Sequence, residues 1–171
     1  MKKLYAFLTA ILLLSASENF AQCSETPQTK VLLVGDSWAW FMNTDGTINT
    51  VFKNWGHSNY RFFSNSTLAV NGAETADVIK ASCEAEIQNQ LAANPGIEVV
   101  HLSIGGNDFL GDWNRNMTMG QTDTLADAVF VKLDSIIRFI KSCRPGIKIL
   151  WSGYCYTNFK EVITQVGQFG P

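Results

Sequence analysis

The chain has 171 residues, of which 46% are hydrophobic and 16% charged, so it holds enough apolar material for one buried core. This composition excludes a disordered tail and a collagen-like polymer. Thirteen lysines and arginines stand against 15 acidic residues, and the net charge of −2 without a block of like charge argues against binding to nucleic acid.

The first 21 residues have the pattern of a secretory signal peptide. Two lysines at positions 2 and 3 precede an apolar run over residues 4–14, which is shorter than the ~20 residues that span a bilayer. We expect cleavage after Ala21, export to the periplasm or the outside of the cell, and no stable membrane span in the mature chain. Residues 22–171 then form a single domain, since the sequence shows no repeat and no linker.

Four cysteines follow the leader, namely Cys23, Cys83, Cys143 and Cys155. In an exported protein they are free to form disulfides in any of three pairings, and buried free thiols fit equally well. No Cys-x-x-Cys spacing indicates a metal site, and we expect no metal and no cofactor. A lipid anchor on Cys23 also stays open, although Gln22 stands where lipid-modified proteins usually have a small residue.

Short apolar runs alternate with helical patterns along the rest of the chain. Strands are expected at residues 30–35, 60–64, 97–104 and 147–151. Helices are expected at residues 47–55, 74–93 and 122–143. This alternation predicts an α/β protein with a doubly wound parallel sheet and helices on both faces.

Small and polar residues gather directly after the first three predicted strands. Gly35-Asp36-Ser37-Trp38 follows the first strand, Ala69-Val70-Asn71-Gly72-Ala73-Glu74-Thr75 follows the second, and Gly105-Gly106-Asn107-Asp108 follows the third. Ligands of doubly wound sheets bind beyond the carboxyl ends of the strands. We therefore predict that the three loops form one site.

The residue types in these loops fit nucleophilic acyl transfer. Ser37, at a strand-to-helix turn, would be an exposed nucleophile, and its attack on an ester creates an oxyanion that needs positioned donors. The backbone N–H groups of Ser37 and Gly72 and the side-chain amide of Asn107 could supply three, and a glycine lets its amide approach without a Cβ. Three further residues are expected to contact the substrate, namely Asp36, Trp38 and Asp108, with an orienting or capping role as the alternative for Asp36.

These blocks resemble the SGNH (GDSL-type) hydrolases, a family of esterases and lipases, over most of residues 30–152. The resemblance implies that Ser37 is the nucleophile, that Ser37, Gly72 and Asn107 form the oxyanion hole, and that the fold is a flavodoxin-like three-layer sandwich. It further implies an esterase that cleaves carboxylic esters of small molecules or acylated carbohydrates through a Ser37 acyl-enzyme. Trp38 stands where many members have leucine. Five aromatic residues near the site either bind a sugar or acyl group or simply cover the sheet: Trp38, Trp40, Phe41, Phe109 and Trp113.

The resemblance stops before the catalytic base, which this family carries in an Asp-x-x-His motif near its C-terminus. The only histidines here are His57, expected at the opposite end of the sheet from Ser37, and His101, expected inside the third strand. We therefore expect a C-terminally truncated chain that lacks the last strand and helix and has little or no esterase activity. A natural protein without the base, acting as a non-catalytic carbohydrate- or partner-binding module, remains the alternative.

Overall fold

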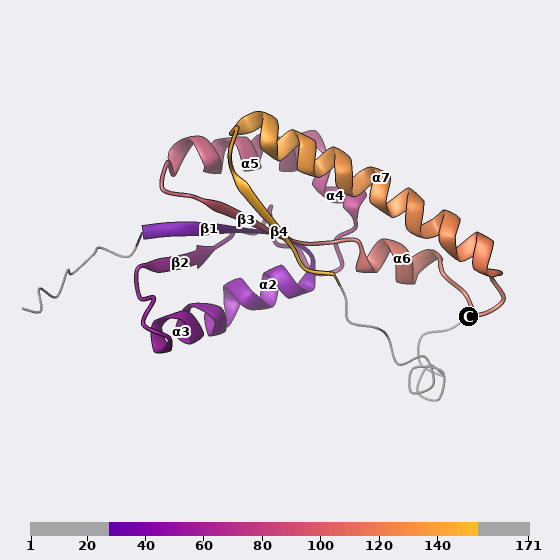
Figure 1. Ribbon diagram of the computed structural model, residues 1–171, viewed down its shortest axis with the longest axis horizontal. Coiled ribbons are helices and arrows are strands. Elements are labelled where there is room, and N and C mark those ends of the chain that lie inside the picture. Colours follow the sequence, from indigo (N-terminus) through magenta and orange to yellow (C-terminus); the bar gives the residue numbers. More distant parts are fainter. Residues whose placement is uncertain (1–27, 154–171) are drawn as a thin grey trace, which may run out of the picture.

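A computed structural model of the chain describes residues 28–153, which form a four-stranded parallel sheet between layers of helices (Figure 1). The strands are β1 (Gln28–Gly35), β2 (Tyr60–Phe63), β3 (Val99–Ser103) and β4 (Lys148–Trp151). They lie in the order β2-β1-β3-β4, and each neighbouring pair is parallel. This order is that of a flavodoxin-like sheet up to its fourth strand, so the predicted fold class is confirmed. The expected absence of a last strand and helix concerns the chain after residue 153, outside the described residues.

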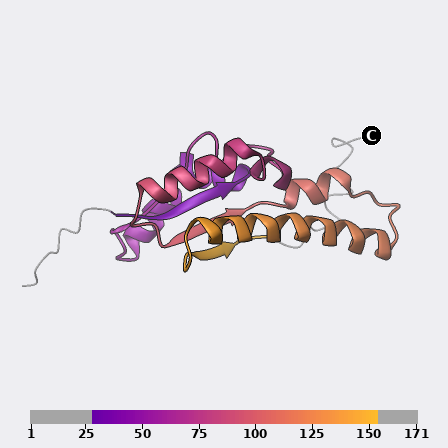
Figure 2. The ribbon, with the colours of Figure 1, turned by 90° about the horizontal axis from the view of Figure 1, so that it is seen from above.

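Helices cover both faces of the sheet. One face carries α2 (Ser37–Thr44) and α3 (Thr47–Asn54), which pack on β1 and β2. The other face carries α4 (Thr75–Val78), α5 (Ala81–Ala93) and α7 (Met119–Cys143). Figure 2 shows α5 and α7 running beside one another over the strands, while α6 (Gly106–Asp112) extends past the carboxyl ends of the sheet.

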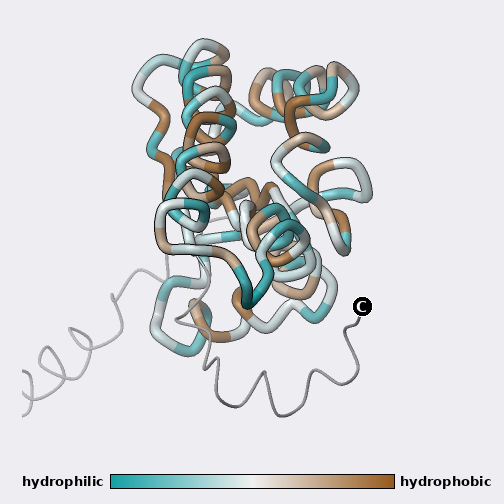
Figure 3. Tube along the Cα trace, turned by 90° about the vertical axis from the view of Figure 1, so that its right-hand side faces the viewer, coloured by the Kyte–Doolittle hydropathy of each residue, from teal (hydrophilic) through white to brown (hydrophobic). Residues whose placement is uncertain are grey.

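The core has two parts because the central strands are buried on both faces. Leu32 and Val34 of β1 join the cluster under α5 and α7, whereas Val31 and Leu33 join the smaller cluster under α2 and α3. Strands buried on both sides show continuous apolar runs instead of alternation. The helices carry hydrophobic and hydrophilic stretches in turn, as Figure 3 shows, because only one side of each faces the core.

The single helix expected over residues 74–93 is wrong, because the structure divides it. The backbone at Lys80 is extended (φ −59°, ψ 139°), so α4 ends at Val78 and α5 begins at Ala81. The apolar stripe of α5 is buried as expected through Cys83, Ile87 and Leu91. The bend lets the short α4 follow the second loop of the site while α5 lies along the sheet.

Two short helices flank the candidate site where the sequence shows no helical period. α2 begins directly after β1 and α6 directly after β3, within the segment expected to be a loop. Each is 8 residues or fewer, and α6 contains two glycines, so neither is long enough for a hydrophobic stripe to stand out. The third expected helix also begins early, at Met119, where a capping box between Thr118 and Gln121 starts α7.

Two of the four cysteines lie in the described part, and both Cys83 and Cys143 are free thiols. Burial raises the pKa of the Cys83 thiol to about 11, so this group is an unreactive part of the core. The other two cysteines and the predicted signal peptide lie outside the described residues. Within residues 28–153, none of the helices combines the length and the apolar character needed to cross a bilayer.

Candidate active site

Backbone hydrogen bonds bring the three predicted loops together at the carboxyl ends of the strands. The N–H of Gly35 donates to the carbonyl of Leu68 (2.7 Å), and its carbonyl accepts from the N–H of Val70 (2.9 Å), so the second loop runs beside the end of β1. On the other side, the N–H of Asp36 donates to the carbonyl of Ser103 at 2.8 Å. The prediction that these loops meet is confirmed.

Gly35 makes this close approach possible. A Cβ at this position would lie 1.9 Å from the carbonyl oxygen of Ser103, and the φ angle of 143° is one that other residues rarely adopt. Any side chain would therefore push β1 away from β3. The glycine before the predicted nucleophile is fixed by the geometry of the sheet.

Ser37 is the first residue of α2 and is partly exposed, at the strand-to-helix turn that the sequence predicts. The first N–H groups of a helix have no intrahelical partner and carry partial positive charge, which favours an anion beside them. The backbone N–H of Ser37 is therefore in a position suited to an oxyanion.

Asp36, for which the sequence leaves either a substrate contact or a capping role open, is buried. The side chain is 0% exposed, and its carboxylate accepts hydrogen bonds from the N–H of Trp38 (3.0 Å) and from the hydroxyl of Ser103 (3.2 Å). It caps the N-terminus of α2 and joins that helix to β3. These contacts fit the orienting and capping role among the two that the sequence leaves open for Asp36.

Gly72 is exposed and has a φ of 78°, which glycine adopts readily. No atom lies within 4 Å of where its Cβ would be, so the backbone conformation, and not contact with other protein atoms, requires glycine. The open space beside Gly72 leaves room for a substrate to approach its backbone.

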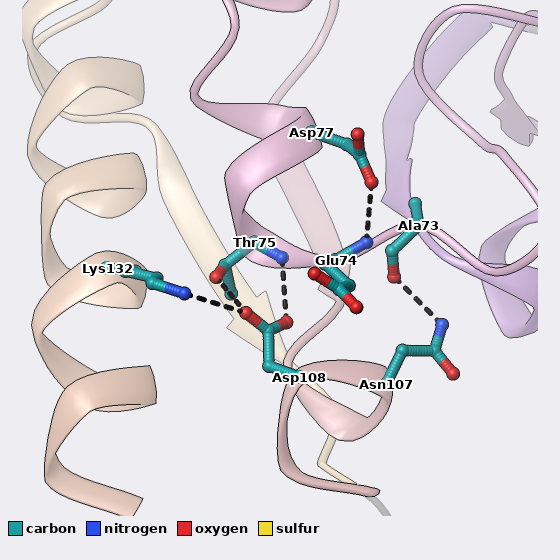
Figure 4. Close-up of polar contacts among 7 residues, drawn as sticks. All are labelled: Ala73, Glu74, Thr75, Asp77, Asn107, Asp108 and Lys132. Atoms are coloured by element: carbon teal, nitrogen blue, oxygen red, sulfur yellow. Dashed lines mark hydrogen bonds and ion pairs between the residues drawn. The ribbon is translucent and has the colours of Figure 1, made fainter. Parts of the chain in front are cut away.

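Asn107, the second residue of α6, faces the same loop (Figure 4). Its Nδ2 donates to the carbonyl of Ala73, next to Gly72, at 2.8 Å. A side-chain amide has two N–H groups, so this bond leaves one for an oxyanion. The structure thereby links the two loops that carry the second and third expected donors.

Asp108, also expected to contact the substrate, has its carboxylate bound inside the protein. This residue is 5% exposed, and both of its carboxylate oxygens accept hydrogen bonds from Thr75. Its carboxylate is therefore occupied inside the protein and joins α6 to α4.

Exposed aromatic rings surround the start of α2. Trp38 is 57% exposed and Phe41 is 48% exposed, and they lie three residues apart on the same side of the helix. Trp40 contacts Phe41 edge-to-face, with ring centroids 5.0 Å apart. The expectation that Trp38 contacts the substrate fits this placement and stays a prediction, whereas Phe109 and Trp113 are half-buried.

Neither histidine hydrogen-bonds to Ser37. His57 is exposed and lies just before β2, at the amino end of that strand and so at the opposite end of the sheet from Ser37. His101 is buried in β3, as expected, where burial lowers its pKa. The described residues therefore give Ser37 no histidine base.

His101 forms a pair that the sequence did not predict, because its partner, Ser152, lies 51 residues away. Its Nε2 is 2.9 Å from the hydroxyl of Ser152, a distance typical of a nucleophile and its base. However, the Nδ1 of His101 has no hydrogen-bond partner, so no carboxylate orients the ring. The pair is best explained as a contact between β3 and the residue that follows β4.

No protein-family model matches the sequence, and a comparison with curated proteins finds no match either. Similar solved structures include the acetyl xylan esterase AlAXEase, at 20% identity and a TM-score of 0.49, over 71% of this chain and 56% of that one. TesA has 21% identity and a TM-score of 0.46, over 81% of this chain and 70% of that one. A GDSL-like lipase from Bacteroides thetaiotaomicron has 15% identity and a TM-score of 0.40, over 72% of this chain and 47% of that one. The chain thus spans a little over half the length of the acetyl xylan esterase.

Proposed function

We propose that the domain is an exported serine hydrolase of the SGNH type, which cleaves carboxylic esters through a Ser37 acyl-enzyme. The observation that carries the proposal is that three loops meet at the carboxyl ends of the strands. There Ser37 begins α2, and the Asn107 amide is hydrogen-bonded to the residue after Gly72.

In the proposed reaction, the Ser37 oxygen forms a bond to the ester carbonyl carbon, and the C=O electron pair moves onto the oxygen. The N–H groups of Ser37 and Gly72 and the remaining N–H of Asn107 stabilise that oxyanion. The pair then returns, the C–O bond to the alcohol breaks, and the alcohol leaves with the proton that Ser37 lost. Water releases the acid from the acyl-enzyme by the same steps.

Proton transfer from Ser37 is the step that the described residues do not support. Losing the base of a serine hydrolase costs on the order of 10⁶-fold in turnover. We propose that the base lies in an Asp-x-x-His motif encoded after the codon for Pro171. Sequencing the gene through that codon tests this directly, since a frame that continues into the motif supports the proposal and an immediate stop codon contradicts it.

The nucleophile can be tested on the chain itself with an aryl fluorophosphonate at pH 9, where hydroxide partly replaces a base. We expect slow labelling that peptide mapping locates at Ser37 and that Ser37→Ala removes. Labelling at other serines, with Ser37 untouched, would rule out the proposed nucleophile.

The exposed rings of α2 favour an acylated carbohydrate as the substrate. Trp38 follows the nucleophile directly, and α2 carries no charged residue, so this surface suits the apolar face of a sugar. The same rings, together with the missing base, support the alternative of a non-catalytic carbohydrate-binding module. Saturable binding of an oligosaccharide without labelling of Ser37 favours the module, and labelling of Ser37 favours the enzyme.

Export is a proposal that rests on the first 21 residues of the sequence alone. The N-terminus of the protein recovered from the periplasm or medium of an expressing bacterium is expected to be Gln22. An intact N-terminus at Met1 would contradict export, and a lipid-modified Cys23 would show an anchored form.

A further inference from the structure

Asp108 stands out because a buried carboxylate lies directly beside the candidate oxyanion hole without facing it. The residue is the third of α6, and its side chain is turned toward α4 (Figure 4). Its Oδ2 accepts from the backbone N–H of Thr75 at 2.7 Å, and its Oδ1 accepts from the Thr75 hydroxyl. Thr75 is itself 0% exposed, so the whole contact is shielded from water.

The charge of this carboxylate is balanced from a third helix. Lys132 of α7 places its Nζ 3.4 Å from the Oδ1 of Asp108, with its own side chain 44% exposed. A buried carboxylate is costly unless donors and a countercharge compensate it. Thr75 and Lys132 together provide both, which explains why the charge is tolerated there.

Residues 107 and 108 thus hold the second loop at two points. Asn107 binds the carbonyl of Ala73, and Asp108 binds Thr75 two residues later. Gly72 itself is exposed and lies between Val70, whose N–H donates to the carbonyl of Gly35, and these two contacts, so the loop is anchored on both sides of it. The contacts of Asn107 and Asp108 provide the anchors on the C-terminal side of Gly72, and they tie its loop to the helix that carries the Asn107 amide.

We propose that Asp108, with its charge balanced by Lys132, is the positioning residue of the oxyanion hole. The role rests on the proposed function and concerns the ground-state order of the loop, which can be measured without turnover. An interaction that matters only when the oxyanion forms lowers the rate of reaction and leaves ligand binding unchanged.

The test compares Asp108→Asn with Asp112→Asn, its exposed control at the end of the same helix. Asparagine removes the negative charge and replaces one carboxylate oxygen by an NH₂ group, so the two charge-assisted hydrogen bonds from Thr75 are lost or weakened. By NMR we expect exchange of the Thr75 amide proton to become about 10- to 100-fold faster, because hydrogen bonds to charged groups are the strong ones. The Gly72 amide and the Asn107 side-chain amide should shift with it, while the amides of β1 and β3 keep their protection.

Substitutions at the two partners keep the test decisive if Asp108→Asn does not fold. Thr75→Val removes only the hydroxyl and should loosen the loop, whereas Thr75→Ser keeps both donors and should restore it. Lys132→Met removes the countercharge and should shift the same three signals by less. Unchanged Gly72 and Asn107 signals in Thr75→Val and Lys132→Met would overturn the positioning role.

Fluorophosphonate labelling provides the second readout. Asp108→Asn should lower the maximal labelling rate about tenfold or more at an unchanged half-saturating concentration, and Thr75→Ser should react like the wild type. A change in half-saturation alone would contradict a positioning role. If Ser37→Ala is labelled as fast as the wild type, the proposed function fails, and the NMR shifts still decide whether Asp108 orders the loop.

Discussion

Gly35 lies where β1, β3 and the second loop of the candidate site come together, and only a residue without a side chain fits there. Its N–H and carbonyl hold the second loop, and its missing Cβ admits the carbonyl of Ser103. The sequence places a glycine there, but only the structure shows what it lies against.

Gly35→Ala should therefore destabilise the domain by about 3 kcal/mol or more, since overpacking and backbone strain act together. Urea unfolding followed by circular dichroism measures this. Gly120→Ala is the matched control, because its Cβ would meet nothing within 4 Å and its φ is ordinary. The control should be neutral or slightly stabilising, as expected for alanine in a helix. Equal midpoints for the two variants would contradict the close approach.

The sequence predicted that the three loops lie together but not the environment of the carboxylates that they carry. Ser37 and Asn107 stand out in the sequence because three polar loops follow successive apolar strands in order. Asp36 and Asp108 belong to the same pattern, yet both are buried in the structure. Their partners, Ser103 and Thr75, lie 67 and 33 residues away in the chain, so no local spacing announces these hydrogen bonds.

Arg144 connects the end of α7 to the end of α5. Its guanidinium donates to the carbonyl of Ile97 at 2.7 Å and to the carbonyls of Leu91 and Asn94. Those carbonyls lie at the C-terminus of α5 and in the turn that leads into β3, where backbone acceptors lack helical partners.

Arg144→Met should lower the free energy of unfolding by about 2 kcal/mol, since it removes a charged donor from several partly buried carbonyls. Arg138→Met is the control, because Arg138 makes only an exposed ion pair with Asp134 one helical turn away. That pair should be worth less than about 1 kcal/mol. Thermal unfolding of both variants is the measurement, and a control that loses as much as Arg144→Met would contradict the capping role.

The sequence predicted the long elements well and the short ones poorly. The stripes of α5 and α7 are long enough for the helical period to show, and their buried positions include Ile87 and Ile136. The break at Lys80 and the helix α6 follow from backbone conformations and contacts between loops. A hydrophobic pattern carries no information on either.

Among the described residues, β4 is one of the two edge strands and carries exposed apolar side chains. β4 is the last strand in the sheet order, and Leu150 and Trp151 on it are 56% and 39% exposed. Phe130 of α7 packs edge-to-face against Trp151, at a centroid distance of 5.8 Å, and is itself exposed. Uncovered edges with apolar side chains favour self-association.

Leu150→Lys should therefore reduce self-association of the chain, since a charge on an edge strand opposes pairing. Sedimentation velocity at several concentrations measures it. Val131→Lys, on an exposed position of α7, is the control for added charge alone. If both variants reduced self-association equally, the edge strand would be excluded as its cause.

The buried His101 makes the stability of the whole domain depend on pH. Burial lowers its pKa below the ordinary 6.5, so between these values the unfolded chain binds a proton that the folded chain does not. Stability from this group is complete above pH 6.5 and is lost as the pH falls toward the folded pKa. The carboxyls of Asp77, Glu86 and Glu98, whose pKa values are also lowered, act in the same direction but below about pH 4.5.

His101→Gln should remove most of the slope of unfolding free energy between pH 7.5 and 5.5. The measurement is a set of urea titrations across that range for the wild type and the variant. The wild type is expected to lose stability as the pH falls while the variant stays nearly flat. Parallel slopes would show that another group is responsible.

The central question for the proposed enzyme is which serine reacts and which groups assist it. Two serines compete: Ser37 beside the linked loops, and Ser152, which has a histidine within hydrogen-bond distance. The measurement is the site and rate of fluorophosphonate labelling in the wild type, Asn107→Ala and Ser152→Ala. We predict labelling of Ser37 that slows about 10²-fold or more in Asn107→Ala, as for the loss of an oxyanion donor, and is unchanged in Ser152→Ala. Labelling of Ser152, or a Ser37 rate indifferent to Asn107, would contradict the assignment.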